Sequence, residues 1–417
     1  MRVVALTLLA ILAQAQQIPQ ERQLNLDSFE KVWITIRDKH WQKDPAGLDW
    51  QKIHDEYRPQ AEKAKTIDET RVVIRAMLGR LKETHFAILP SRVYTNVEES
   101  SAGSGSTGIE LRILDGEAIV VSVDPHSSAE ELGVKAGWKI QNAKGENIAD
   151  AIKSVSNLTE LMATRAIANN LSGPIGSSIK ATFLDGAGKS QERALDLREP
   201  RGRLTTFGNL PPTYVWVDSR HIQNTGYIRF NEFLDLVRVM NTFSDLIKSC
   251  EHCDGLIIDL RGNPGGIGGM AMGMAGFLID KPNQRLGTTY LRDATLNFVI
   301  NPRPNQFSGP VAILVDSSSA STSEIFAGGL KDLGRARIFG TRTAAAALPS
   351  VIERLPNGDG FQYAIANYIS EGGKALEGLG VEPDETVKLT RESLLAGHDA
   401  VLDAALNWIQ KKGNQKQ

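Results

Sequence analysis

The stretch that decides the fold is Val311–Gly334, VAILVDSSSASTSEIFAGGLKDLG. It opens with five apolar residues, three of them β-branched, which is typical of a buried strand. Serines and a threonine follow, and then apolar residues recur at helical spacing until Gly334. Backbone N–H groups at such a strand-to-helix turn can stabilise an oxyanion. The same residues also form a capping box, with Ser321 as N-cap and Glu324 at N3, so a purely structural role is the competing interpretation.

Composition narrows the class of protein. A chain of 417 residues is too long for one ordinary core and predicts two or three domains. The hydrophobic content of 41% and charged content of 23% are typical of a soluble globular protein. With a formal net charge of −2, there is no reason to expect a nucleic-acid or anionic membrane partner. The seven histidines show no HExxH spacing, so no metal centre is predicted.

Residues 1–15 have the three parts of an export signal. Arg2 supplies the positive charge, Val3–Ala13 is apolar, and Ala13-Gln14-Ala15 resembles a cleavage site. The apolar run is too short to cross a bilayer. We therefore expect an exported protein, periplasmic or extracellular, with no membrane span in the mature chain. The alternative is a buried N-terminal strand or helix.

The two cysteines, Cys250 and Cys253, lie in the sequence SCEHC. They follow a helical pattern and precede a strand, whereas a thioredoxin-like redox motif opens a helix after a strand. A zinc site would need two further ligands, and His252 is the only obvious one. Two unpaired thiols and a local disulfide in an oxidising compartment both remain open.

The pattern of apolar residues divides the rest of the chain into three parts. Residues 16–94 read as an N-terminal helical subdomain with amphipathic helices, preceded by a loose polar segment at Gln16–Asn25. A glycine/serine-rich break leads into short strands and helices that predict a compact α+β domain over 95–200, including one helix over 150–168. From 201 to 417, apolar strands alternate with helices, which predicts an α/β sheet covered on both faces. The predicted fold class is therefore multidomain α/β.

A second motif precedes the first. Leu256–Gly266, LIIDLRGNPGG, reads as a buried strand that ends in a glycine turn, where Gly265-Gly266 permit close backbone approach. A strand ending DLRGNPGG followed by a strand ending SSSASTSE resembles the tail-specific, or carboxy-terminal processing, serine protease family. The resemblance covers about residues 25–410. It implies a crotonase-like (ββα) catalytic core, a PDZ domain before it, and no metal or organic cofactor.

The α+β domain carries its own resemblance. Thr107, Gly108, Ile109 and Glu110 are similar to the carboxylate-binding loop of a PDZ domain. Backbone N–H groups beside Gly108 would capture a terminal carboxylate, and the adjacent strand edge would pair with the peptide. Trp138 departs from the pattern, because an aspartate usually follows the preceding glycine.

The resemblance also implies catalytic roles. Ser321 is the nucleophile, and backbone N–H groups of Gly265 or Gly266 and of Thr322 form the oxyanion hole. One branch of the family uses a lysine base, but the lysine position here is Ala346, which cannot take a proton.

A second branch, which includes the tricorn protease core, uses a histidine and a glutamate. Thr84-His85 and the segment EGLGVEPD, which begins at Glu377, match that pattern. His85 is then the general base and later the acid, Glu377 orients the imidazole, and Thr84 assists. A base with an ordinary pKa near 6.5 suits this chemistry at neutral pH.

The predicted function is that of an exported serine endopeptidase. It would hydrolyse peptide bonds of unfolded or tail-exposed polypeptides through an acyl-enzyme, with the PDZ domain assisting the capture of free C-termini. One alternative is a non-catalytic protein on the same fold that binds an apolar ligand or a peptide, since the four alanines at 344–347 would leave room for a ligand. Another is a PDZ-containing scaffold.

Overall fold

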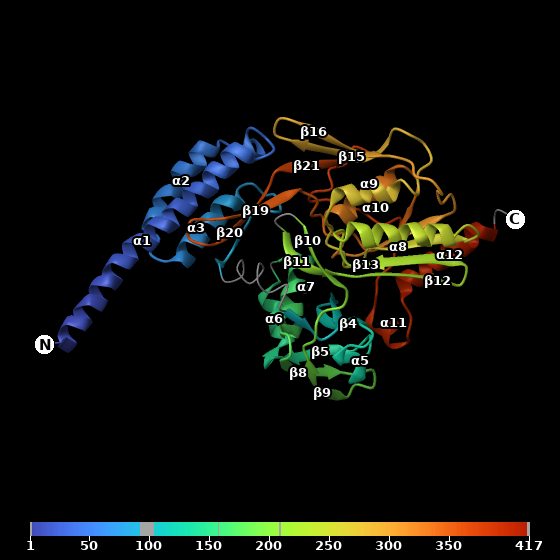
Figure 1. Ribbon diagram of the computed structural model, residues 1–417, viewed down its shortest axis with the longest axis horizontal. Helices are drawn as coiled ribbons and strands as arrows, with labels where there is room; N and C mark the ends of the chain where they lie inside the picture. The colour runs from blue at the N-terminus through green and yellow to red at the C-terminus, as the bar shows by residue number, and fades with distance from the viewer. Residues whose placement is uncertain (1, 92–103, 157, 208–209, 415–417) are drawn as a thin grey trace. The chain divides into compact units, whose positions relative to one another are not determined.

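The computed structural model describes residues 2–91, 104–156, 158–207 and 210–414. They form two compact units (Figure 1). The first unit holds the described residues up to 91 together with Thr289–Leu296 and Leu348–Tyr368, and the second unit holds the rest. No helix in the described residues is long and apolar enough to cross a membrane.

The first unit combines helices with a small antiparallel sheet. Its helices are α1 (Arg2–Lys39), α2 (Trp50–Lys63) and α3 (Ile67–Gly79). Asp49 and Thr66 cap α2 and α3 by accepting backbone N–H bonds. The sheet has the order β1 (Ala87–Leu89), β20 (Gly360–Ala364), β19 (Ser350–Arg354). Its core includes Phe29, Trp33, Trp50, Met77 and Phe361.

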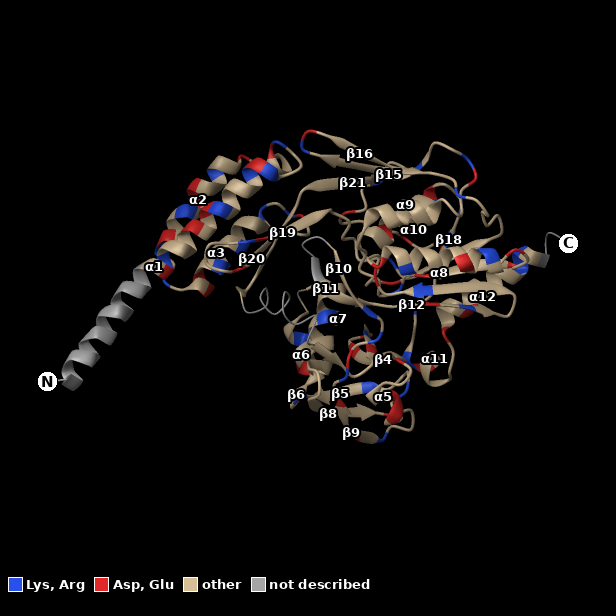
Figure 2. Cartoon of the chain, in the orientation of Figure 1, with Lys and Arg blue, Asp and Glu red and all other residues tan. Residues whose placement is uncertain are grey.

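The expectation of a loose segment over 16–25 is wrong, because these residues belong to α1. Glutamine, glutamate, arginine and leucine all have good helix propensity. Gln23 also donates a hydrogen bond to Asp27 one turn later. Figure 2 shows basic and acidic residues mixed along α2, consistent with the near-zero net charge.

The second unit begins with an α+β part. Its sheet has the order β3 (Ile109–Leu114), β4 (Glu117–Val123), β5 (Lys139–Ala143), β8 (Ser178–Leu184), β9 (Ser190–Asp196), with the short β6 (Glu146–Asn147) on β5. The helices are α5 (Ser128–Glu131), α6 (Ile148–Ser154) and α7 (Glu160–Ala168). Strands β2 (Ser104–Ser106) and β7 (Ser172–Pro174) form a separate pair.

The single helix expected over 150–168 is two helices. The first, α6, ends with Val155 as C-cap, and α7 starts anew where the Thr159 side chain accepts the N–H of Met162. A capping threonine in the middle of an apolar pattern therefore marked a new helix start.

The core of the second unit is a six-stranded sheet. Its order is β12 (Val217–Ile222), β13 (Thr225–Phe230), β14 (Gly255–Asp259), β17 (Val311–Val315), β18 (Arg337–Gly340), β22 (Glu385–Thr386). Every neighbouring pair after β12–β13 is parallel. Both β14 and β17 are buried along their whole length, as expected for strands with covered faces.

Helices cover this sheet on both faces. One face packs α12 (Ala400–Asn414), through Val401, Ala405 and Ile409, against inward residues of β14, β17 and β18. The remaining large helices are α8 (Leu236–Ser249), α9 (Gly268–Ala275) and α10 (Thr322–Asp332), which run side by side in Figure 1. The multidomain α/β prediction with N-terminal helices is confirmed.

The other elements are small. Strands β10 (Arg203–Phe207) and β11 (Leu210–Val215) form a pair, and β16 (Thr295–Ile300), β15 (Gln284–Leu291) and β21 (Ala366–Ser370) form a three-stranded sheet in that order. The short helix α11 (Arg391–Leu395) precedes α12, and η1 (Pro45–Gly47) and η2 (Asn169–Leu171) are single 3₁₀ turns.

Candidate active site

Ser321 lies in the turn between β17 and α10, where parallel strands of the core sheet end. It is half-buried and is the N-cap of α10. Its φ is 52° and its ψ is −117°. A non-glycine residue in this region costs about 1–3 kcal/mol, and such residues gather at functional sites because the surrounding structure must hold them there. Ser321 is therefore both the N-cap that the sequence predicted and the candidate nucleophile.

The glycine turn after β14 packs directly on Ser321. Gly265 has a φ of +103° and Gly266 a φ of +132°. A Cβ atom added at Gly265 would lie 2.8 Å from both Ser321 Cβ and Thr322 N. The hydroxyl of Thr322 donates to the carbonyl of Gly266 across 2.7 Å. The structure thus brings together the three residues expected to form the oxyanion hole.

Asn263, which the sequence reasoning missed, holds this turn. Its side chain is fully buried; Oδ1 accepts the N–H of Gly265 across 2.9 Å, and Nδ2 donates to the carbonyl of Phe230 across 2.9 Å. Ser323 donates its hydroxyl to the Asn263 carbonyl. The N–H of Gly265 is therefore already used. In the described part of the chain, the N–H groups of Gly266 and Thr322 donate no hydrogen bond.

Glu324 is at N3 of the capping box, as the sequence predicted, and it makes further contacts that the sequence did not reveal. Its carboxylate is fully buried. Oε2 accepts the N–H of Ser321 across 2.9 Å and that of Ala346 across 3.0 Å. Oε1 accepts the Thr343 hydroxyl across 2.6 Å and the N–H of Ala345 across 2.9 Å. Burial raises the pKa of Glu324 to about 7, against the lowering effect of these four hydrogen bonds.

Glu377 contacts the same segment of chain. Its Oε2 accepts the N–H of Ala347 across 3.0 Å, and the N–H of Gly378 donates to the carbonyl of Ala345. The carbonyl of Ala346 in turn accepts the N–H of Ser321 across 2.9 Å. The second unit therefore links Ser321 and Glu377 through the backbone of residues 345–347.

Thr84 and His85 lie in the first unit, between α3 and β1. Both are half-buried. Thr84 Oγ1 and His85 Nδ1 are 2.7 Å apart, which is hydrogen-bond distance. His85 has a φ of 62°, so it too occupies the left-handed region that non-glycine residues rarely adopt.

The residues expected to bind a peptide lie at the start of β3. Thr107 is buried and its carbonyl accepts the N–H of Ala129, while the N–H of Gly108 donates to Ser106 Oγ across 2.9 Å. Ile109 is partly buried beside these residues. A Cβ at Gly108 would lie 2.1 Å from Ser127 Cβ, so only glycine fits there.

Glu110, the fourth of these residues, pairs with arginines. It contacts Arg229 at 2.8 Å and Arg112 at 2.9 Å, and Arg112 also pairs with Asp316 at 2.8 Å. Burial raises the pKa of Glu110, but the two arginines outweigh this effect and hold the pKa below its usual range. This network joins β3 to the ends of β13 and β17. The carboxylate of Glu110 is therefore paired with arginines of the second unit.

A cavity of about 260 Å³ lies beside β3 and α7. Its walls include Ile109, Leu161, Thr164, Arg165 and Trp216. Strand β3 is the edge strand of its sheet, so one row of its backbone groups is not paired within that sheet.

Comparison with known proteins gives two family matches. Residues 224–387, which include Ser321, match peptidase family S41, and residues 24–79 match the tricorn protease C1 domain. The chain therefore carries a peptidase family S41 domain and a tricorn protease C1 domain. It is a serine peptidase, as the motifs around Gly265 and Ser321 predicted, and the predicted relationship to the processing proteases is confirmed.

The named relatives agree. The chain is 28% identical over 388 residues to the chloroplastic C-terminal processing peptidase of Tetradesmus obliquus, covering 89% of this chain and 78% of the relative. It is 26% identical over 329 residues to a carboxyl-terminal-processing protease of Picosynechococcus sp., covering 78% and 74%.

A solved structure supports the fold of this S41 peptidase. The photosystem II D1 C-terminal processing protease superimposes with a TM-score of 0.59 at 22% identity, covering 91% of this chain and 98% of that one. Mature CPAF gives a TM-score of 0.61 at 15% identity, covering 94% and 97%.

Proposed function

We propose that this S41 peptidase cleaves peptide bonds through an acyl-enzyme on Ser321, with His85 as general base and Glu377 and Thr84 in support. His85 takes the proton as Ser321 Oγ attacks the carbonyl carbon, and then gives it to the leaving amine. A water molecule, activated in the same way, hydrolyses the ester. The N–H groups of Gly266 and Thr322 stabilise the oxyanion in each tetrahedral intermediate.

The observation that carries this proposal is the conformation of Ser321. A serine with a φ of 52° stands at the N-terminus of α10, and a glycine turn is packed against it. A capping serine does not need this strained geometry, because ordinary N-caps have extended backbone angles. A rigidly held nucleophile beside backbone donors does benefit from it.

The geometry around the other two residues fits their proposed roles. Since Thr84 Oγ1 lies at hydrogen-bond distance from His85 Nδ1, Thr84 fixes the ring and we assign proton transfer to Nε2. Glu377 is held by the N–H of Ala347 and supplies a carboxylate that stabilises the imidazolium formed when the serine proton moves.

We further propose that the α+β part acts as a PDZ domain that captures free C-termini of unfolded polypeptides. The edge strand β3 and the neighbouring cavity beside α7 provide backbone pairing and a side-chain pocket. A terminal carboxylate would replace the Ser106 hydroxyl that accepts the N–H of Gly108. The signal-like residues 1–15 support export to the periplasm or exterior.

Fluorophosphonate labelling tests the catalytic assignment. The wild type should be labelled, and Ser321→Ala and His85→Ala should abolish labelling while retaining the folded circular dichroism spectrum. His126→Ala is a matched control, because His126 is another histidine with positive φ, at 61°, outside the proposed site. Equal labelling of His85→Ala and His126→Ala would contradict the role of His85.

Peptides with free or amidated C-termini test the capture of chain ends separately. The proposal expects a higher kcat/KM for the free acid, and Gly108→Ala should remove this preference because its Cβ would collide with Ser127. Equal kcat/KM for the two peptides would refute C-terminal capture without affecting the catalytic assignment.

A further inference from the structure

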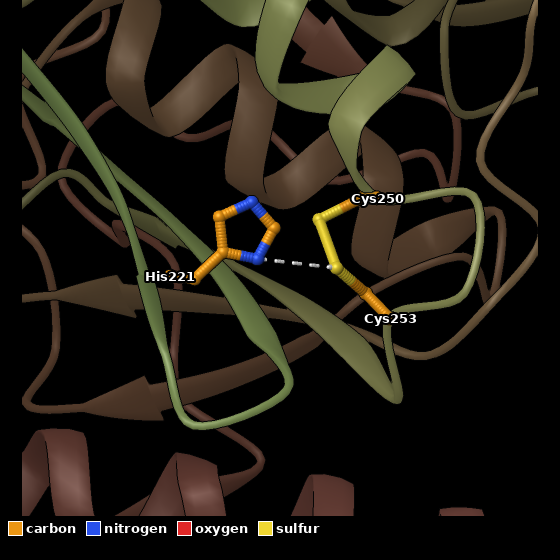
Figure 3. A group of neighbouring side chains, drawn as sticks. All are labelled: His221, Cys250 and Cys253. Carbon is orange, nitrogen blue, oxygen red and sulfur yellow. Dashed lines mark hydrogen bonds between the residues drawn. A yellow bond between two sulfur atoms is a disulfide. The ribbon is translucent and has the colours of Figure 1, made fainter.

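Three side chains from separate elements converge at the end of the core sheet opposite to the end where Ser321 lies. His221 is the second-to-last residue of β12, Cys250 is the C-cap of α8, and Cys253 lies in the turn before β14 (Figure 3). Cys250 and Cys253 form a disulfide, which is one of the two states that the sequence left open. Their ligand atoms all lie within 4.8 Å of one another, and in the described residues this is the one such group of metal-ligating side chains.

The hydrogen bonds of Ser249 indicate which tautomer His221 adopts. Ser249 donates its hydroxyl proton to the carbonyl of Leu246 across 2.8 Å, so its oxygen can only accept from the ring. The ring's Nε2 lies 3.0 Å from that oxygen and therefore carries the proton. The Nδ1 atom is left as a base, and it points at Cys253 Sγ from 3.7 Å.

A base aimed at a disulfide sulfur has no proton to accept, because a disulfide carries none. The arrangement instead resembles that of a metal-binding histidine, whose second ring nitrogen is usually held by a hydrogen-bond acceptor. A tetrahedral Zn²⁺ with Zn–S of about 2.3 Å and Zn–N of about 2.05 Å separates the sulfur and nitrogen ligands by about 3.6 Å. The distance between Cys253 Sγ and His221 Nδ1 already matches this value.

The surroundings also favour a cation. Cys250 ends α8, and the C-terminal end of a helix carries a partial negative charge that stabilises cations. Room for the Cys250 sulfur is built into β13, since a Cβ at Gly226 would lie 2.4 Å from it. Cys250 is buried, whereas His221 is exposed, so an ion could enter, and water could complete its coordination, from the His221 side.

We propose that the reduced Cys250–Cys253 pair and His221 bind one Zn²⁺ ion, with water as the fourth ligand. A dithiol reductant supplies two electrons and two protons, the S–S bond breaks, and the reductant becomes a disulfide. Zinc then binds the two sulfurs and His221 Nδ1 and displaces the two thiol protons to solvent. The ion would fasten the β12–β13 hairpin to the end of α8, so the site exists in a disulfide form and a metal form.

Cobalt substitution on the full-length protein tests this proposal. Protein reduced with a phosphine under anaerobic conditions is titrated with Co²⁺ and then with Zn²⁺, and absorbance is recorded. One equivalent of Co²⁺ should give tetrahedral d–d and thiolate charge-transfer bands that Zn²⁺ abolishes. Ser249→Ala should weaken Zn²⁺ binding by about 10- to 100-fold, because the ring loses its orienting partner.

The variants separate His221 from the other nearby histidine. His221→Ala and Cys253→Ser should lose the tetrahedral spectrum, whereas His252→Ala should keep it, because His252 lies between the cysteines in sequence and outside the cluster. His221→Asn provides a second variant if the alanine variant does not fold. The proposal is overturned if the reduced wild type binds no Co²⁺, or if folded His221 variants retain the wild-type spectrum and Zn²⁺ affinity.

Discussion

Replacing Gly265 by alanine should disable Ser321 without unfolding the protein. The added Cβ would lie 2.8 Å from Ser321 Cβ and from Thr322 N, whereas ordinary contacts begin at 3.4 Å, so these atoms must shift by about 0.6 Å. A displacement of about 1 Å at a reacting group can cost about 100-fold in rate. We therefore expect fluorophosphonate labelling and kcat/KM to fall by between about 10- and 100-fold.

Gly334→Ala is the matched control for this substitution. Gly334 also has a positive φ, +66°, but nothing lies within 4 Å of its added Cβ. It should show the strain of a left-handed alanine, about 1–2 kcal/mol, with labelling unchanged. Circular dichroism melts would report folding for both variants. Labelling of folded Gly265→Ala at the wild-type rate would refute the conclusion that the glycine turn positions the nucleophile.

Three further outcomes follow from buried carboxylates. Glu324→Gln should lower the unfolding free energy in urea by about 1–3 kcal/mol, because its amide leaves at least one buried N–H without an acceptor; an unchanged midpoint would contradict this. Since burial raises the pKa of Glu324 to about 7, the folded protein binds a proton that the unfolded chain has lost above about pH 4.5. The stabilisation from this bound proton is complete below about pH 4.5 and is lost as the pH rises through 7. The difference in unfolding free energy between wild type and Glu324→Gln should therefore fall from pH 5 to pH 8. A constant difference would show that Glu324 does not titrate in this range. Asp359→Ala in the first unit removes the buried one of the two carboxylates that pair with Arg71 and leaves only the exposed Asp68. It should cost about 3–5 kcal/mol in the same urea assay, and a loss under 1 kcal/mol would show that the pair with Asp68 is enough to satisfy Arg71.

The sequence predicted the parts of the site that depend on local pattern. The strand, the turn and the helix around Ser321 follow from residue spacing alone, and so does the glycine turn at Gly265-Gly266. The capping residues were visible too, although the sequence could not show that Ser321 caps its helix in a strained conformation. In that conformation the N–H of Ser321 donates to the carbonyl of Ala346, which lies 25 positions later.

The parts that the sequence could not reveal depend on residues far apart in the chain. Asn263 looked like one residue of a turn, yet its amide joins that turn to β13 and α10. His221 is 29 positions before Cys250, and only the β12–β13 hairpin brings it to the cysteines. Neither residue spacing nor a sequence motif predicts such contacts, because they depend on the order of the strands in the sheet.

Residues 345–347 contact the candidate site although an alanine occupies the position of the family's lysine base. Where a related branch places its lysine, the backbone N–H groups of Ala345, Ala346 and Ala347 bind the carboxylates of Glu324 and Glu377. These contacts use main-chain N–H groups, so the side chains of residues 345–347 need only be small enough to pack beside Ser321. The base that we propose, His85, comes from a different segment, so residues 345–347 are left to hold acceptor side chains. An alanine run is therefore compatible with the proposed pairing of Ser321 with Glu377.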